Sequence, residues 1–100
     1  MLRITIEQNE KAMAIKLEGR IAGPWAAELS RVWERTAPSL AARKLSIDLR
    51  DATYSDVDGT RILRTIYHQT GAELVSGTPW TQYLAEEVAR DGADQFPEEA

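Results

Sequence analysis

The sequence has no cysteine, a single histidine and no excess of positive charge. Without cysteine, the chain forms no disulfide and carries out no thiolate chemistry. His68 has no second histidine or cysteine with which to build a zinc site. The formal net charge of −4 provides no basic surface for nucleic acid or for an anionic membrane. We therefore expect no cofactor and no nucleic-acid partner.

Long apolar runs are also missing from the start of the chain. Residues 1–7 alternate between apolar and polar side chains, which indicates a strand and not a signal peptide or a transmembrane helix. We expect no membrane insertion and a cytoplasmic location. The composition that is present, 43% apolar and 28% charged residues, suits one small domain with its own core. We expect this domain over residues 1–92, followed by a short acidic tail over residues 93–100 that frays.

Periodic apolar residues predict the element order β-β-α-β-α-β-α. Alternation over residues 2–6 and 13–17 predicts an antiparallel hairpin, and further strands are expected at 45–49 and at about 73–76. A first helix starts at Gly23-Pro24, and we expect Pro38 to interrupt it. A second helix passes through residues 62–67 and ends before Gly71. A third starts at Thr78-Pro79, with Thr78 as its cap, and ends before Gly92.

Helices that separate consecutive strands imply right-handed crossovers between parallel neighbours. The fold class expected is therefore α/β, a four-stranded mixed sheet with an N-terminal antiparallel hairpin, then parallel strands, and about three helices packed on it. Binding sites in such sheets lie beyond the carboxyl ends of the parallel strands, where loops meet helix N-termini. This rule directs attention to the segment from Arg50 to Thr60.

Three short motifs in this order resemble those of STAS domains, the family of bacterial anti-sigma-factor antagonists. Residues 17–22 (LEGRIA) resemble the Leu-x-Gly-x-Leu-Asp signature at the end of the family's second strand. Residues 47–49 (IDL), 54–59 (YSDVDG) and 62–63 (IL) resemble its Asp-Leu to Asp-Ser-Ser/Thr-Gly-Leu-x-x-Leu segment. Residues 71–75 (GAELV) resemble the Gly-x-x-Leu strand that follows. The resemblance covers roughly residues 2–90, and it implies the STAS fold and a partner-binding surface around the turn.

Departures from the family pattern fall in that turn. In the antagonists, a kinase anti-sigma factor phosphorylates the first serine of the turn and so abolishes binding. Val57 stands at the matching position and has no hydroxyl, and Asp58 follows where the family has Ser or Thr. Ala22 replaces an aspartate that contacts partners. The resemblance implies a non-phosphorylatable binding surface formed by these residues: Ala22, Gly23, Ser55, Asp56, Val57, Asp58, Gly59 and Thr60.

Two roles are open for Asp58. As the N-cap of the second helix its carboxylate would accept N–H groups of the first turn, with Val57 packed inward. Alternatively, Asp58 holds the turn in a permanently charged state that partly imitates a phosphorylated serine. Thr53, Ser55 and Thr60 are hydroxyls near the turn, and they are either substitute phosphoacceptors or plain solvated residues.

An enzymatic interpretation of the same turn also exists. Asp56-Val57-Asp58-Gly59-Thr60 resembles the first motif of the haloacid-dehalogenase phosphohydrolases, in which the first Asp is the nucleophile. That Asp ends a buried parallel strand, whereas residues 51–55 alternate poorly and predict a loop. The pattern also fails as an EF-hand loop, because Tyr54 and Thr65 would stand where carboxylates are required. We expect no enzyme.

The function expected from the sequence is a protein-binding regulatory module whose partner is an anti-sigma or kinase-type protein. One alternative is a soluble accessory subunit of a membrane transporter ATPase, and another is a sensor of a small ligand or nucleotide. Trp25 and Trp80 each follow a loop at the end of a strand, so either would serve as an interface anchor if it is partly exposed. Trp33 is expected in the core.

Overall fold

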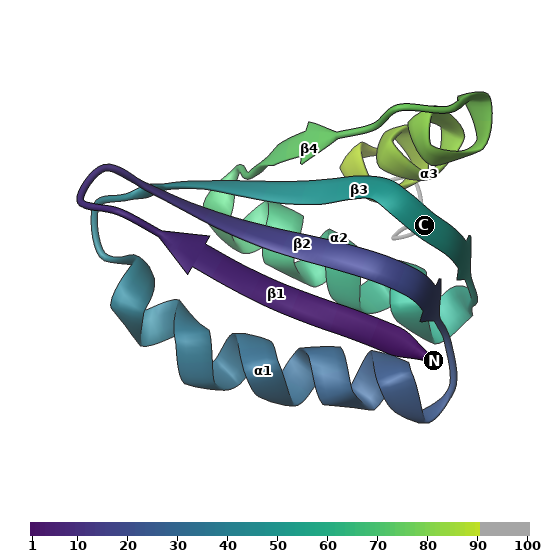
Figure 1. The fold of residues 1–100 in the computed structure, drawn as a ribbon, viewed down its shortest axis with the longest axis horizontal. Helices are drawn as coiled ribbons and strands as arrows, with labels where there is room; N and C mark the ends of the chain where they lie inside the picture. The colour runs from purple at the N-terminus through teal and green to yellow at the C-terminus, as the bar shows by residue number, and fades with distance from the viewer. Residues whose placement is uncertain (91–100) are drawn as a thin grey trace, which may run out of the picture.

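The computed structural model describes residues 1–90. Its elements follow the expected order (Figure 1). The strands are β1 (Leu2–Gln8), β2 (Ala12–Ile21), β3 (Lys44–Ser55) and β4 (Glu73–Val75). The helices are α1 (Pro24–Leu40), α2 (Val57–Thr70) and α3 (Pro79–Ala89).

The sheet is mixed, and its strands lie in chain order, β1-β2-β3-β4. β1 and β2 form the antiparallel hairpin, with Ile4 opposite Leu17 and Ile6 opposite Ile15. β2 pairs with β3 and β3 with β4 in parallel, each after a helical crossover. The α/β fold class expected from the sequence, a four-stranded mixed sheet with three helices, is therefore confirmed.

The core lies between one face of the sheet and the helices. Alternate residues of β2 and β3 are buried on that face, while the residues between them, such as Lys16 and Asp48, line the opposite, polar face. Each of the three helices contributes buried side chains to the same cluster, so all three cover the same face. The buried members on the central strands and helices are Met13, Ile15, Leu17, Ile21, Leu45, Ile47, Leu49, Ala52, Leu29, Trp33, Leu63, Ile66, Leu84 and Val88.

The prediction of a loop over residues 51–55 is wrong, because β3 continues to Ser55. Two register shifts in the β2–β3 ladder, one between Lys16 and Glu18 and one between Gly19 and Arg20, disturb the alternation that a regular strand would show. Ala52 remains buried inside this irregular stretch. Strand pairing thus persists where the sequence pattern fades.

The helix boundaries differ from the prediction in detail. Pro38 does not interrupt α1, which continues to Leu40. Ala37 and Leu40 pack against the core and hold this last turn in place, although proline removes one helical hydrogen bond. Thr78 caps α3 as expected, with Pro79 in the first turn. β4 ends at Val75, one residue early, and Gly92 and the predicted tail lie outside the described residues.

Candidate functional site

Asp56 is the residue that organises the turn between β3 and α2. It caps α2, and its Oδ1 accepts a hydrogen bond from the backbone N–H of Gly59 at 2.7 Å. Its Oδ2 accepts the N–H of Gly23 at 2.9 Å, so the same carboxylate reaches the loop after β2. The expectation that Asp58 caps the helix is wrong by two residues, because β3 is longer than expected and α2 begins directly after it.

Both hydrogen bonds favour the ionised form of Asp56. They lower the pKa of this carboxyl below its ordinary value, with the Gly59 N–H as the largest cause and the Gly23 N–H next. Partial burial acts in the opposite direction and is outweighed. Asp56 is thus a fixed negative charge that joins the loops after β2 and β3.

Gly59 lets the first turn of α2 approach the end of β2. It is buried, and a Cβ at this position would collide with the backbone oxygen of Ile21 and stand 2.8 Å from the Ser55 Oγ. No other residue type fits this contact without movement of the backbone. The predicted residues Gly23, Asp56 and Gly59 are therefore brought together by the fold.

Val57 and Asp58 both point to solvent. Val57 is 72% exposed, so the expectation that it packs inward is wrong. Gly59 takes the inward position, and Val57, two residues earlier, lies roughly 200° around the helix from it. The Asp58 carboxylate is 67% exposed and pairs with Arg61 at 2.7 Å. Val57 is thus an exposed apolar side chain at the start of α2.

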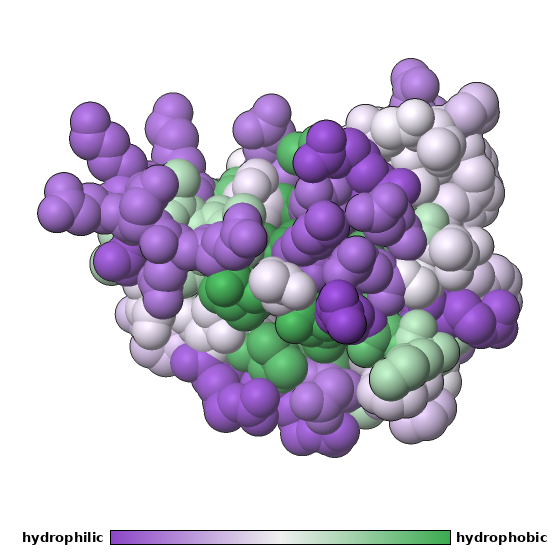
Figure 2. All heavy atoms as spheres, viewed as in Figure 1, coloured by the Kyte–Doolittle hydropathy of each residue, from purple (hydrophilic) through white to green (hydrophobic). Residues whose placement is uncertain are grey.

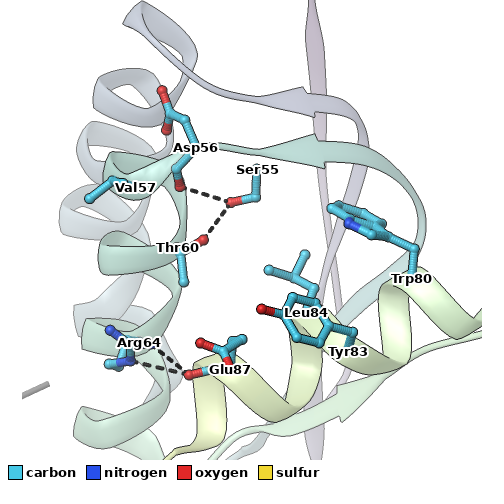
Figure 3. A pocket seen from close by; sticks show the side chains of 9 residues that line it. All are labelled: Ser55, Asp56, Val57, Thr60, Arg64, Trp80, Tyr83, Leu84 and Glu87. Atoms are coloured by element: carbon cyan, nitrogen blue, oxygen red, sulfur yellow. Dashed lines mark hydrogen bonds between the residues drawn. The ribbon is translucent and has the colours of Figure 1, made fainter. Parts of the chain in front are cut away.

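The hydroxyls near the turn differ in their surroundings. The Ser55 Oγ lies 2.9 Å from the Thr60 Oγ1 and donates to the backbone oxygen of Asp56 at 3.3 Å (Figure 3). Both side chains are half-buried, whereas Thr53 is exposed on β3. Ala22 is also half-buried, and its backbone oxygen accepts the Trp25 N–H.

A groove of about 340 Å³ lies between α2 and α3. Figure 3 shows Trp80, Tyr83 and Leu84 of α3 across this groove from the residues of α2. Arg64 of α2 joins the two helices, because its Nη2 and Nε donate to the backbone oxygen of Glu87 at 2.7 and 3.3 Å. The groove is lined by Ser55, Asp56, Val57, Thr60, Arg64, Trp80, Tyr83, Leu84 and Glu87.

A second groove of about 300 Å³ lies on the other side of α2, against α1. Asp58, Arg61 and Ile62 line it from α2, and Ala26, Ala27 and Ser30 line it from α1. Val57 therefore borders one groove and Asp58 the other, and the first turn of α2 stands between them.

Large exposed apolar side chains gather at this end of the molecule. We call them the apolar rim: Met1, Trp25, Tyr54, Val57, Trp80 and Tyr83, which within residues 1–90 are all the large hydrophobic side chains classed as exposed. Each lies at the carboxyl end of a parallel strand, in the first two turns of the helix that follows, or beside the end of β2 at the start of β1. The Arg20 guanidinium stacks on the Tyr54 ring at 4.5 Å.

The sequence identified only part of this rim. Trp25 and Trp80 are exposed by 36% and 37%, which meets the condition set above for an interface anchor, and Trp33 is buried. Met1, Tyr54 and Tyr83 were missed. Tyr54 lies in the segment that the sequence pattern predicted as a loop. Tyr83 lies off the apolar stripe of α3, and an aromatic residue in that position could have been recognised from the sequence as exposed.

Within residues 1–90, no helix is long and apolar enough to cross a membrane. The same residues contain no group of three or more acidic or histidine side chains placed to hold a metal ion. His68 is exposed near the C-terminal end of α2.

Comparison with solved structures identifies the fold. No family model matches the chain, and no curated protein matches its sequence. Among solved structures, it is similar to an uncharacterized protein of the DUF3478 family with a SpoIIAA-like fold from Shewanella loihica PV-4. The TM-score is 0.53 at 15% sequence identity, over 85% of this chain and 77% of the other. The chain therefore has a SpoIIAA-like fold, the fold of STAS domains and anti-sigma-factor antagonists.

Proposed function

We propose that this chain is a non-enzymatic, cytoplasmic regulatory module that binds a protein partner through the apolar rim and the first turn of α2. The observation that carries the proposal is the apolar rim itself. Exposed tryptophan and tyrosine side chains are the usual anchors of protein interfaces. The rim lies where open α/β sheets place their binding sites.

Val57 supports a surface that binds without a phosphorylation switch. It occupies the position of the family's phosphoacceptor serine, and its side chain carries no hydroxyl. Its exposure of 72% makes it available to a partner. Ser55 and Thr60 are each already engaged by the other's hydroxyl, which leaves Thr53 as the more accessible acceptor nearby.

The contacts of Asp56 support a structural and not a catalytic role. Since β3 runs to Ser55, Asp56 does follow a strand, as a phosphohydrolase nucleophile would. Both of its oxygens, however, accept backbone N–H groups that hold the turn together. A carboxylate with this environment is a weak nucleophile, because its charge is stabilised in the ground state.

A phosphatase assay tests the enzymatic alternative. Incubation with p-nitrophenyl phosphate and magnesium should give no turnover above that of buffer. Turnover that disappears in Asp56→Asn, in a variant that remains folded, would overturn the non-enzymatic assignment.

A matched pair of variants on α3 tests the binding surface. Tyr83 belongs to the rim, and the adjacent Gln82 is exposed but lies outside both grooves. In affinity capture from native lysate with quantitative mass spectrometry, Tyr83→Ala should lose a protein that wild type and Gln82→Ala retain. Equal recovery by all three would contradict the proposed surface. An anti-sigma kinase among the captured proteins would indicate sigma regulation, and a transporter ATPase would indicate the accessory role.

A further inference from the structure

Among the strands of residues 1–90, β1 lies at one edge of the sheet. It pairs only with β2 among the described strands (Figure 1). Figure 2, drawn from the same side, shows apolar side chains surfacing in the middle of the view, where β1 crosses it. Ile4 and Ile6 of this strand are only half-buried against the core. An unpaired edge of this kind is a template for another strand.

Two hydrogen bonds show which backbone groups point outward. At one end of the hairpin the backbone oxygen of Met1 accepts a hydrogen bond from the Arg20 N–H. At the other end the Asn9 N–H donates to the backbone oxygen of Ala12. Backbone groups alternate sides along a strand, so the odd residues face β2. The N–H and C=O groups of the even residues, Leu2 to Gln8, therefore face away from the sheet.

We propose that a second copy of this chain pairs with β1, antiparallel and centred on Thr5, to form a two-fold symmetric dimer with a continuous sheet. In this register Leu2 lies opposite Gln8 of the second copy, Arg3 opposite Glu7, and Thr5 opposite Thr5. This register places every outward-facing residue of β1 in a hydrogen-bonded pair, with Ile4 opposite Ile6 of the second copy. It also buries the exposed parts of these two isoleucines.

The charged side chains of β1 favour the same register. Arg3 lies opposite Glu7 of the second copy, twice in the dimer, because the symmetry axis passes between the two Thr5 residues. Within residues 1–90, neither side chain makes an ion pair in the monomer. Shifting the centre to Ile4 or to Ile6 would place Arg3 or Glu7 opposite an uncharged residue and leave outward N–H groups unpaired. Opposite charges across a strand pair stabilise it, and like charges destabilise it.

Charge exchange at these two positions tests the dimer in solution. Strand pairing alone buries less surface than the roughly 1,600 Å² of a standard interface, so sedimentation should be followed from about 1 μM to 1 mM. The wild type should dimerise in this range. Arg3→Glu and Glu7→Arg should each weaken association about tenfold or more, because each makes both cross-axis pairs repulsive. The double variant should restore it, and a mixture of the two single variants should form heterodimers.

A cysteine at the centre tests the register independently, since the chain has no other cysteine. Thr5 would form a non-hydrogen-bonded pair with Cα atoms about 4.5 Å apart, within the reach of a disulfide. Under mild oxidation, Thr5→Cys should cross-link, whereas Ser39→Cys, exposed on α1, should not. A wild type that stays monomeric throughout, or a dimer unaffected by either charge variant, would overturn the proposal. β1 lines neither groove, and Met1 is the one rim residue beside it, so the capture experiments with Tyr83 and Val57 variants test the proposed binding function separately from the dimer.

Discussion

Asp56 shows how one side chain fixes the geometry of the proposed binding surface. Its two oxygens bind the first turn of α2 and the loop after β2, so it fixes the relative position of the turn and of the start of α1. Gly59 completes the arrangement by allowing the helix to touch Ile21. Neither residue needs to contact a partner in order to matter for binding, since together they hold Val57 at the surface.

Acid should weaken the fold partly through Asp56. Its pKa is lowered in the folded state, so its contribution to stability is present above the ordinary aspartate pKa of about 3.9 and is lost as pH falls through the lower, folded value. Asp48 acts in the same direction, because the Arg50 side chain lowers its pKa. Urea unfolding between about pH 7 and 3 should show a shallower acid slope in Asp56→Asn than in wild type. An unchanged slope would show that the two N–H bonds do not form in solution.

Gly59→Ala should be strongly destabilising. The added methyl group meets backbone on β2, so the free energy of unfolding should fall by about 3 kcal/mol. Gly77→Ala is the matched control, because the atoms nearest to the added methyl group there belong to the Arg50 side chain, with Cγ at 3.1 Å, and not to backbone. Comparable losses in the two variants by urea denaturation would show that the α2–β2 contact is looser than described.

At the scale of elements, α3 matters because it carries Trp80 and Tyr83. It packs on α2, and Arg64 fastens its C-terminal end through the Glu87 carbonyl. The capping box of Thr78 and Thr81 fixes its other end. The α2–α3 groove therefore depends on two local restraints at opposite ends of α3.

Two arginines on α2 provide a comparison. Arg64→Ala should lower the free energy of unfolding by about 1–2 kcal/mol, because it removes charge-assisted bonds to the half-buried end of α3. Arg61→Ala should cost less than about 0.5 kcal/mol, because its ion pair with Asp58 is exposed. Hydrogen exchange should accelerate in α3 only in the first variant. Unchanged exchange in α3 after Arg64→Ala would indicate that apolar packing alone positions this helix.

Sequence periodicity predicted the elements that have a regular apolar stripe. The strands and helices that form the core were found for this reason, and so was the Thr78 cap. The pattern failed where tertiary pairing overrides it. Residues 51–55 form a strand only because the shifted register of β2 supports them. Because the sequence pattern ended β3 too early, it placed the start of α2 two residues too late. The roles of Asp56, Val57 and Asp58 were therefore assigned wrongly.

At the scale of the whole molecule, the two faces and two ends of the sheet differ in character. Helices cover one face, and the other is polar. The carboxyl end of the parallel strands carries the apolar rim, with Val57 between the two grooves. The central claim is that this end binds a protein partner through an apolar contact that no phosphorylation switches off.

The most direct test of this claim is to change Val57 alone and to measure quantitative capture of the partner. Val57→Thr keeps the shape of the side chain and adds only a hydroxyl, whereas Val57→Glu introduces charge at the same exposed position. We predict that Val57→Thr retains the partner and that Val57→Glu reduces its recovery about tenfold or more, corresponding to at least about 1.4 kcal/mol of binding free energy. Equal recovery by wild type and Val57→Glu, with both proteins folded, would contradict the account.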